Sequence, residues 1–291
     1  MKLATAAYPL DILNTWADYE SKLTDWVTQA ADAGADLMVF PEYGAMELAS
    51  LDGPADDMET ALRSVDRYLP RADDLHDRLA RQHQVTILAA SAPAFDNNPR
   101  PANRARLFGP DGPIGQQDKQ IMTMVERDIA VVPGAPLQVF DTTLGRVGVL
   151  ICYDGEFPDL GRALVDAGVQ IILAPSFTKA VSGYWRVRIG AMARALEGQC
   201  ITVHSPCVGD GLGCPAFGPS TGAAGAFGPP DLGFPDDGII ALGDMNAPGW
   251  VFADIADDAV TNVRNNGAVR NFQHRNEQSE RLAPVKFTAA E

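Results

Sequence analysis

The sequence predicts an α/β fold in which helices cover buried sheet. Short apolar runs, most of them rich in β-branched residues, alternate with amphipathic stretches along most of the chain. Such runs are typical of strands that are covered on both faces. The 291 residues would suffice for two domains, but no second core and no linker divides them. We therefore predict one α/β domain over residues 1–270 and a polar C-terminal tail over residues 271–291.

The strands are predicted from apolar runs that end at a turn or a polar residue. They are residues 3–7, 37–40, 85–89, 147–151, 171–173 and 201–203. Helices are predicted where apolar residues recur three or four positions apart, over residues 16–33, 73–82, 158–167 and 184–197. Gly34 and Gly168 follow two of these helices, and glycine is common just after a helix ends. Residues 239–241 and 250–255 predict a pair of strands near the C-terminus.

Residues 209–238 differ from the rest of the chain because they contain nine glycines and five prolines. Glycine and proline favour turns, so a long loop or a series of turns is predicted here. The segment has no Gly-Lys-Ser or Gly-Lys-Thr sequence that would cradle a phosphate.

Charge and composition exclude several classes of partner. Lys and Arg total 23 while Asp and Glu total 38, which gives a net charge of −15. Such a surface repels phosphate backbones and anionic lipids, so neither nucleic acid nor membrane is an expected partner. No apolar run reaches the roughly 18 residues of a membrane span, and the first residues do not resemble a secretion signal. We therefore expect a cytoplasmic protein whose four cysteines are free thiols.

Three side chains stand where chemistry is expected on an α/β sheet. Glu42 and Cys152 each follow an apolar run, and Lys119 precedes Glu126 by seven positions. A cysteine is nucleophilic as its thiolate, which a nearby ammonium stabilises and a carboxylate can generate. Taken singly, a buried cysteine is commonly inert and a lone lysine or glutamate is commonly solvated. The positions of Glu42 and Cys152 at strand ends favour the functional interpretation, because an unused buried carboxylate would be costly.

Three motifs closely resemble, in their order and spacing along the chain, the three motif regions of the nitrilase superfamily of carbon-nitrogen hydrolases. They are Val39-Phe40-Pro41-Glu42-Tyr43, then Asp118-Lys119 with Glu126-Arg127 and Pro133-Gly134, then the stretch from Gly145 to Asp154. The resemblance extends from about residue 3 to about residue 255 and includes Asn103-Arg104-Ala105, Ala174-Pro175-Ser176 and Arg194-Ala195-Leu196-Glu197.

The resemblance implies a four-layer α-β-β-α sandwich and a mechanism without a cofactor. Position by position, it implies Glu42 as general base, Lys119 as cationic partner and Cys152 as nucleophile. It also implies that Glu126 holds Lys119 and helps to position substrate or water. The chemistry of acyl transfer adds the backbone N–H of Tyr153 as a second donor to the oxyanion.

Further residues follow family strands that usually wall the pocket, and each is expected either to contact substrate or to pack. These are Tyr43, Ser176, Phe177 and Trp185. Asp154 is interpreted as a partner for an arginine such as Arg162.

A metal site is not expected. His204 lies near Cys200, Cys207 and Cys214, but their spacing does not match a compact zinc site. No histidine falls within the three motifs, which argues against a Cys-His protease arrangement.

The favoured function is therefore hydrolysis of a non-peptide C–N bond in a small amide, through a thioester, with release of ammonia or an amine and a carboxylic acid. The same residues would serve a nitrilase or an N-carbamoyl (ureido) hydrolase. A catalytically silent scaffold is the alternative from another class, and the intact set of Glu42, Lys119 and Cys152 disfavours it. The resemblance also implies a homodimer or larger homo-oligomer, with residues 184–197 as a candidate interface.

Overall fold

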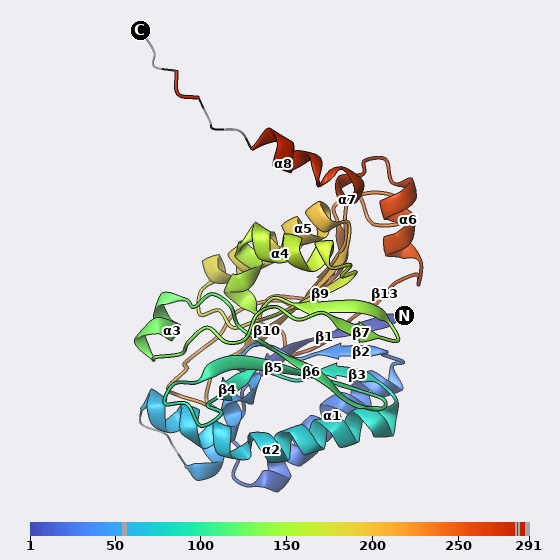
Figure 1. The fold of residues 1–291 in the computed structure, drawn as a ribbon. Helices are drawn as coiled ribbons and strands as arrows, with labels where there is room; N and C mark the ends of the chain where they lie inside the picture. The colour runs from blue at the N-terminus through green and yellow to red at the C-terminus, as the bar shows by residue number, and fades with distance from the viewer. Residues whose placement is uncertain (54–56, 283, 285, 289–291) are drawn as a thin grey trace.

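Helices enclose two packed sheets on both sides in the computed structural model, which describes residues 1–53, 57–282, 284 and 286–288. In Figure 1, α1 (Trp16–Asp32) and α2 (Met58–His83) cover one sheet, while α4 (Pro158–Asp166) and α5 (Val181–Gly198) cover the other. The predicted four-layer α-β-β-α sandwich is confirmed.

The first sheet has the order β4-β5-β3-β2-β1, with β6 paired to β5 and β13 paired to β1. Its strands are β1 (Lys2–Pro9), β2 (Leu37–Val39), β3 (Thr86–Leu88), β4 (Ala92–Ala94), β5 (Ala102–Gly109), β6 (Gly112–Asp118) and β13 (Gly249–Asp254). The second sheet has the order β10-β9-β8-β7, with β11 paired to β10 and to β12. Its strands are β7 (Phe140–Thr142), β8 (Gly145–Val149), β9 (Ile171–Ser176), β10 (Ile201–Val208), β11 (Gly225–Phe227) and β12 (Ile239–Leu242).

The two sheets join only at the end of β1. There Tyr8 lies opposite Cys207 and Pro9 opposite Val208, in a short parallel pairing with β10. Along the rest of this edge, β1 pairs with β13 instead. The sheets therefore separate into two layers soon after they meet.

Alternation of side chains along each strand supplies both sides of a sheet with apolar residues. In β2, Leu37 and Val39 enter the core between the sheets, whereas Met38 faces α1 and α2. In β9, Ile171 enters the core between the sheets and Ile172 packs towards α4. Strands buried on both faces read as continuous apolar runs, which is why the sequence located them.

Several predicted elements need correction. Helix α2 begins at Met58 rather than at residue 73, because Asp57 caps it by accepting a hydrogen bond from the backbone N–H of Thr60 at 2.8 Å. The strands predicted over residues 239–241 and 250–255 form, but they are not partners: β12 pairs with β11 and β13 with β1. The glycine-rich segment from residue 209 to 238 also contains a strand, β11, in the middle of its turns.

The C-terminal part consists of three short helices, α6 (Ala259–Asn266), α7 (Asn271–His274) and α8 (Glu277–Arg281). Phe272 anchors α7 because its ring lies between the guanidinium groups of Arg264 and Arg275, at 4.0 and 3.9 Å. Within the tail predicted from residue 271 to 291, residues 283, 285 and 289–291 lie outside the described part.

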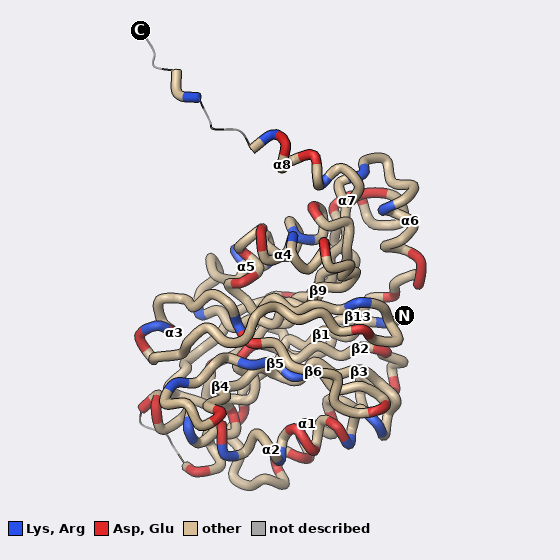
Figure 2. The backbone as a smooth tube through the Cα atoms, in the orientation of Figure 1, with Lys and Arg blue, Asp and Glu red and all other residues tan. Residues whose placement is uncertain are grey.

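Acidic and basic residues are interspersed over the helices, and Figure 2 shows them along α1, α2, α4 and α5. In the described part of the chain, no helix combines the length and the apolar character that crossing a membrane requires.

Candidate active site

Glu42 lies just beyond the end of β2 and is almost completely buried. Its Oε1 accepts hydrogen bonds from Nζ of Lys119 at 2.7 Å and from Nδ2 of Asn103 at 2.9 Å. Its Oε2 accepts one from the backbone N–H of Phe177 at 2.8 Å. Burial raises the pKa of Glu42, and Lys119 only partly counteracts this effect. The carboxylate is therefore a stronger base than a solvated glutamate.

Lys119 follows β6 directly and carries its ammonium between two carboxylates. Nζ lies 2.7 Å from Glu42 Oε1 and 2.7 Å from Glu126 Oε2, and the side chain is 1% exposed. Burial alone would lower the pKa of Lys119, but the negative charges of Glu42 and Glu126 outweigh it and raise the pKa. Lys119 is therefore a permanent cation. An ammonium has three N–H donors, so one remains for a ligand after the two carboxylates are served.

Glu126 is held by the helix on which it lies, α3 (Met124–Asp128). Its Oε2 accepts from the backbone N–H and the hydroxyl of Thr123, both at 2.9 Å, which completes a capping box. Its Oε1 accepts from the hydroxyl of Tyr43 at 3.0 Å. Although burial raises the pKa of Glu126, Lys119 and Thr123 together lower it. Glu126 is thus the carboxylate that stays ionised beside Lys119.

Cys152 follows β8 at the start of the short 3-10 helix η2 (Cys152–Glu156). Its backbone φ is +51°, a left-handed conformation that costs energy in a non-glycine residue. The thiol lies 3.9 Å from the backbone carbonyl oxygen of Phe177 and beside Glu42. Burial and the charge of Glu42 raise the pKa of Cys152, although Lys119 lowers it. The resting thiol is therefore protonated and needs a base before it can react.

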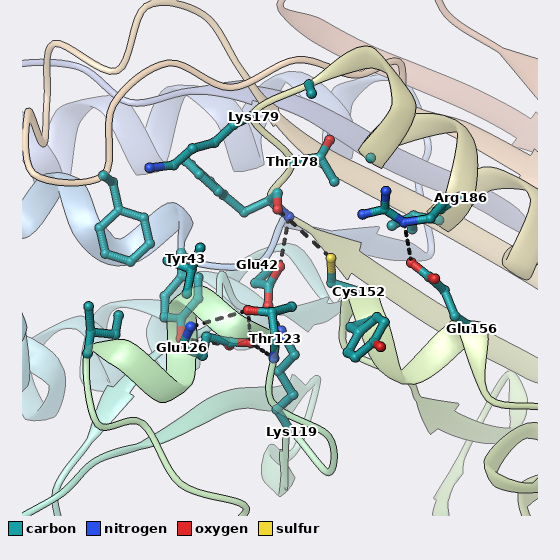
Figure 3. A pocket seen from close by; sticks show the side chains of 18 of the residues that line it. Glu42, Tyr43, Lys119, Thr123, Glu126, Cys152, Glu156, Thr178, Lys179 and Arg186 are labelled. Carbon is teal, nitrogen blue, oxygen red and sulfur yellow. Dashed lines mark hydrogen bonds and ion pairs between the residues drawn. The ribbon is translucent and has the colours of Figure 1, made fainter.

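Figure 3 shows Glu42, Lys119, Glu126 and Cys152 gathered at one pocket of about 320 Å³. The structure thus brings together the four side chains that the sequence placed in the site. Most of the pocket wall is apolar and comprises Tyr43, Met58, Val125, Ile129, Tyr153, Phe177, Val187 and Phe217. Pockets with apolar walls and a few convergent polar groups are typical of small-molecule sites.

Two of the four predicted wall residues are placed elsewhere. Tyr43 and Phe177 line the pocket, but Ser176 is fully buried behind it and its hydroxyl bonds to Nε2 of His204 at 2.7 Å. Trp185 lies on the outer side of α5 and is 47% exposed. Of the two expected roles, Ser176 therefore has the packing role, while Trp185 neither lines this pocket nor is buried. The motif does not specify which face of a strand or helix a residue occupies, so the sequence left these roles open.

Asn103 belongs to the site, although no role was predicted for it and it was named only within a segment of the resemblance. It lies in β5, and its Nδ2 donates to both Glu42 at 2.9 Å and Glu126 at 3.3 Å. The hydroxyl of Ser91 donates to Asn103 Oδ1 at 2.6 Å and accepts from the backbone N–H of Tyr43 at 3.0 Å. One amide therefore ties both carboxylates to the first sheet. An asparagine inside an otherwise buried strand was the available signal, since a buried amide needs partners.

Asp154 binds backbone N–H groups rather than Arg162, which corrects the prediction. Its carboxylate accepts from the N–H groups of Gln120 and Ile121, at 3.1 and 2.8 Å, and from that of Ile151 at 3.3 Å. Arg162 instead pairs with Asp166. The first two amides follow Lys119 and the third precedes Cys152. Asp154 therefore fixes the segment that carries the ammonium relative to the turn that carries the thiol.

The described residues contain no group of three or more His, Cys, Asp or Glu side chains arranged to hold a metal ion. His204 stacks on Tyr184 with ring centroids 5.8 Å apart. Burial lowers the pKa of His204 to about 3, so the imidazole is neutral. His204 is therefore a packed core residue.

Replacing Asp154 tests whether its carboxylate fixes the segment that carries Lys119 relative to the turn that carries Cys152. Asn keeps the size of the side chain but turns an NH₂ group towards backbone donors, so we expect Asp154→Asn to lower kcat by about 10-fold to 100-fold with little change in KM. Asp159→Asn, at an exposed position on α4, is the matched control and should retain the wild-type kcat. Equal kcat values for the two variants, measured on folded proteins, would contradict this role of Asp154.

Comparison with known proteins gives the family of the chain. A model of the carbon-nitrogen hydrolase family matches residues 4–224. The probable hydrolase YhcX of Bacillus subtilis is 31% identical over 277 residues, which cover 94% of this chain and 53% of that protein. The chain thus spans about half the length of this relative. The omega-amidase NIT2-B of Xenopus laevis is 24% identical over 70% of this chain and 75% of its own length.

Solved structures agree on the fold. A carbon-nitrogen hydrolase from Helicobacter pylori superposes with a TM-score of 0.74 and 16% identity, covering 91% of this chain and 92% of that one. Nit3 of Saccharomyces cerevisiae, a nitrilase superfamily member, superposes with a TM-score of 0.72 and 18% identity, covering 91% of this chain and 93% of that one. With a family match over most of its length, this chain belongs to the carbon-nitrogen hydrolase family.

Proposed function

We propose that this enzyme hydrolyses the C–N bond of a small, non-peptide amide and passes through a thioester on Cys152. The observation that carries the proposal is a protonated thiol beside a buried, basic carboxylate and a permanent ammonium, all in one small pocket. These are the parts that nucleophilic acyl transfer needs: a nucleophile, a base and an electrophilic stabiliser.

In the first half of the reaction, Glu42 takes the thiol proton of Cys152 and the thiolate attacks the amide carbon. The negative charge that develops on the amide oxygen is met by the remaining N–H of Lys119 and by the backbone N–H of Tyr153. Glu42 then gives the proton to the amide nitrogen, the C–N bond breaks, and ammonia or an amine leaves. The acyl group stays on Cys152 as a thioester.

In the second half, Glu42 removes a proton from water, which attacks the thioester carbon. The same two donors stabilise the oxyanion, the C–S bond breaks, and the carboxylic acid leaves as the thiol regains its proton. Glu126 holds Lys119 through both halves, since its carboxylate is ionised and fixed by Thr123 and Tyr43. No proton needs to leave the site between the two halves.

Amides rank above nitriles and ureido compounds because relatives of this chain carry the names omega-amidase and deaminated glutathione amidase. The same thiolate would attack a nitrile or a carbamoyl carbon, so both remain the alternative substrates. A silent scaffold would have no reason to retain the coupled Glu42, Lys119 and Cys152. We also propose a cytoplasmic location, which suits a reactive thiol and buried free cysteines.

We further propose that the enzyme forms a homodimer through the outer side of α5. Val181, Trp185, Ile189 and Leu196 follow one another at helical spacing and are 53, 47, 61 and 42% exposed. A stripe of exposed large apolar side chains on one helix marks an interaction surface. A second copy would present the same stripe, so a two-fold contact would be self-complementary.

Ammonia release tests the proposed activity. The purified enzyme, incubated with a panel of small amides, ureido acids and nitriles, should release ammonia from at least one amide, while Cys152→Ala should release none above background. Cys214→Ala, which removes a thiol outside this pocket, is the matched control and should behave as wild type. Activity that survives in Cys152→Ala would overturn the proposal.

The pH profile tests the base. Since Glu42 must be ionised to accept the thiol proton and its pKa is raised, kcat/KM should increase with pH above the range of an ordinary glutamate. Glu42→Gln should lower kcat by about 10²-fold to 10⁴-fold and abolish this rising limb. If the rise of kcat/KM with pH persisted in Glu42→Gln, the titrating group would be a residue other than Glu42.

The mass in solution tests the dimer. Light scattering at micromolar concentration should give twice the mass of a single chain, and Trp185→Asp should give the monomer. Leu232→Asp, at an equally exposed leucine outside α5, should leave the dimer intact. A monomeric wild-type protein would refute the interface.

A further inference from the structure

A buried histidine contacts the strand that leads to the catalytic residues. His204 lies in β10, Ser176 is the last residue of β9, and both are fully buried. Nε2 of His204 is hydrogen-bonded to the hydroxyl of Ser176 at 2.7 Å. The other ring nitrogen, Nδ1, has no hydrogen-bond partner within the described structure. In the described part of the chain, the bond to Ser176 is therefore the only hydrogen bond of this imidazole.

Phe177, the residue after Ser176, touches both the base and the nucleophile through its backbone. Its N–H donates to Oε2 of Glu42 at 2.8 Å, and its carbonyl oxygen lies 3.9 Å from the thiol of Cys152. A displacement of this one residue would therefore disturb both reacting groups together. Catalysis is sensitive to such displacements, since a misplacement of about 1 Å can cost about 10²-fold in rate.

The backbone pairing of β9 with β10 lacks donors at this end. Pro175 lies opposite Ser205, and Ser176 lies opposite Pro206. Proline has no N–H group, so each of these two pairs has one donor fewer than an ordinary pair of a ladder. The side-chain bond between Ser176 and His204 lies at the same end of the two strands. It compensates for the missing donors just before the chain reaches Phe177.

His204 is itself held by α5 and by β1. Its ring stacks on that of Tyr184, with centroids 5.8 Å apart and planes inclined by 19°. The hydroxyl of Tyr184 accepts a hydrogen bond from Nη1 of Arg188 at 3.2 Å. The carbonyl oxygen of His204 accepts one from the hydroxyl of Thr5 at 2.8 Å. Both the ring and the backbone are thus fixed, so His204 can hold Ser176 in place.

Packing and acid-base chemistry do not account for a histidine at this position. A buried polar atom without a partner destabilises the folded state, and Nδ1 is such an atom in the described structure. An apolar side chain would fill the same space without that cost. Burial also lowers the pKa of His204 to about 3, so the ring exchanges no proton near neutral pH. The bond to Ser176 is the remaining role of the imidazole.

We propose that His204 is a positioning residue: through Ser176 it holds Phe177 where the backbone of Phe177 aligns the base with the nucleophile. This inference rests on the proposed amide hydrolysis, in which Glu42 and Cys152 take these two roles. Without the bond between His204 and Ser176, the N–H of Phe177 would bind Glu42 less firmly. A donor to a carboxylate favours the ionised form, so the pKa of Glu42 would then rise further.

Removing both partners of this bond separates positioning from stability. In the double variant Ser176→Ala/His204→Leu, two apolar side chains replace the bonded pair, so Tm should stay within about 4 °C of the wild-type value. We expect kcat to fall about ten-fold while KM changes by less than about two-fold. The rising limb of kcat/KM should move to higher pH, because the pKa of Glu42 rises.

Thr202→Val is the matched control for the double variant. Thr202 lies on the same strand as His204 and is also fully buried, and its hydroxyl donates to the carbonyl oxygen of Ala191 at 3.0 Å. The change removes a buried hydrogen bond between β10 and α5 but leaves the bond to Ser176 in place. Thr202→Val should therefore keep the wild-type kcat and the wild-type pH profile.

Single variants test the bond itself. Ser176→Ala should lower kcat as far as the double variant does, because either change removes the same bond. It also supplies the comparison if the double variant does not fold. The amide of a glutamine can reach the same hydroxyl, so His204→Gln should recover most of the lost kcat. A wild-type kcat and pH profile in Ser176→Ala, or a loss of kcat in Thr202→Val as large as in Ser176→Ala, would overturn the proposal.

Alkylation of Cys152 gives a measurement that needs no hydrolysis. With iodoacetamide, the sulfur forms a bond to carbon, iodide leaves, and the thiol proton passes to Glu42, so the rate depends on the alignment of base and thiol. Peptide mass spectrometry would give this rate at Cys152. It should be about ten-fold lower in Ser176→Ala than in the wild type and unchanged in Thr202→Val.

The alkylation rates separate this inference from the proposed function. The expected rates in an enzyme that hydrolysed none of the offered amides would support the positioning role of His204 and would refute only the proposed hydrolysis. Equal rates in Ser176→Ala and the wild type would refute the positioning role, whether or not the enzyme hydrolyses amides.

Discussion

The ammonium of Lys119 between two buried carboxylates is the interaction on which the site depends. Removing such charges from water costs several kcal/mol per ion, and their attraction offsets this cost only when the remaining hydrogen-bonding positions are also filled. Here they are filled: Asn103 donates to both Glu42 and Glu126, and Tyr43 adds a further bond to Glu126. Few other arrangements would satisfy all these groups, so the network has one geometry before any substrate arrives.

That geometry explains why the site lies between the two sheets. Glu42 follows β2, Asn103 lies in β5 and Lys119 follows β6, and all three strands belong to the first sheet. Cys152 follows β8 of the second sheet, and its side chain joins the apolar core between the layers. Phe177 connects the two, because its N–H bonds to Glu42 and its carbonyl oxygen to the thiol. The distance between base and nucleophile is therefore set by the packing of the sheets.

Local patterns in the sequence predicted an α/β fold and drew attention to Glu42, Lys119 and Cys152, because strands buried on both faces and residues at their ends leave such patterns. The four layers and the role of Glu126 were predicted from the resemblance to a family. The sequence did not predict the role of Asn103, since a polar residue inside a strand shows a need for partners but not their identity. It left open whether Ser176 and Trp185 contact substrate or pack, because the direction of each side chain depends on which face of its strand or helix it occupies. It gave Asp154 an arginine partner because backbone donors leave no trace in a sequence. Contacts between distant segments were the part that could not be predicted.

The turn from Cys152 to Glu156 carries the nucleophile at its start and lines the pocket along its length, through Cys152, Tyr153 and Glu156. Asp154 ties the turn to the segment after Lys119. The carbonyl oxygen of Gly155 accepts a hydrogen bond at 2.9 Å from Nη1 of Arg194, which lies on α5. Glu156, at its end, meets Arg186. A turn held at three successive residues cannot let its two ends move independently. The position of Cys152 is consequently fixed relative to that of Glu156, and both residues line the pocket.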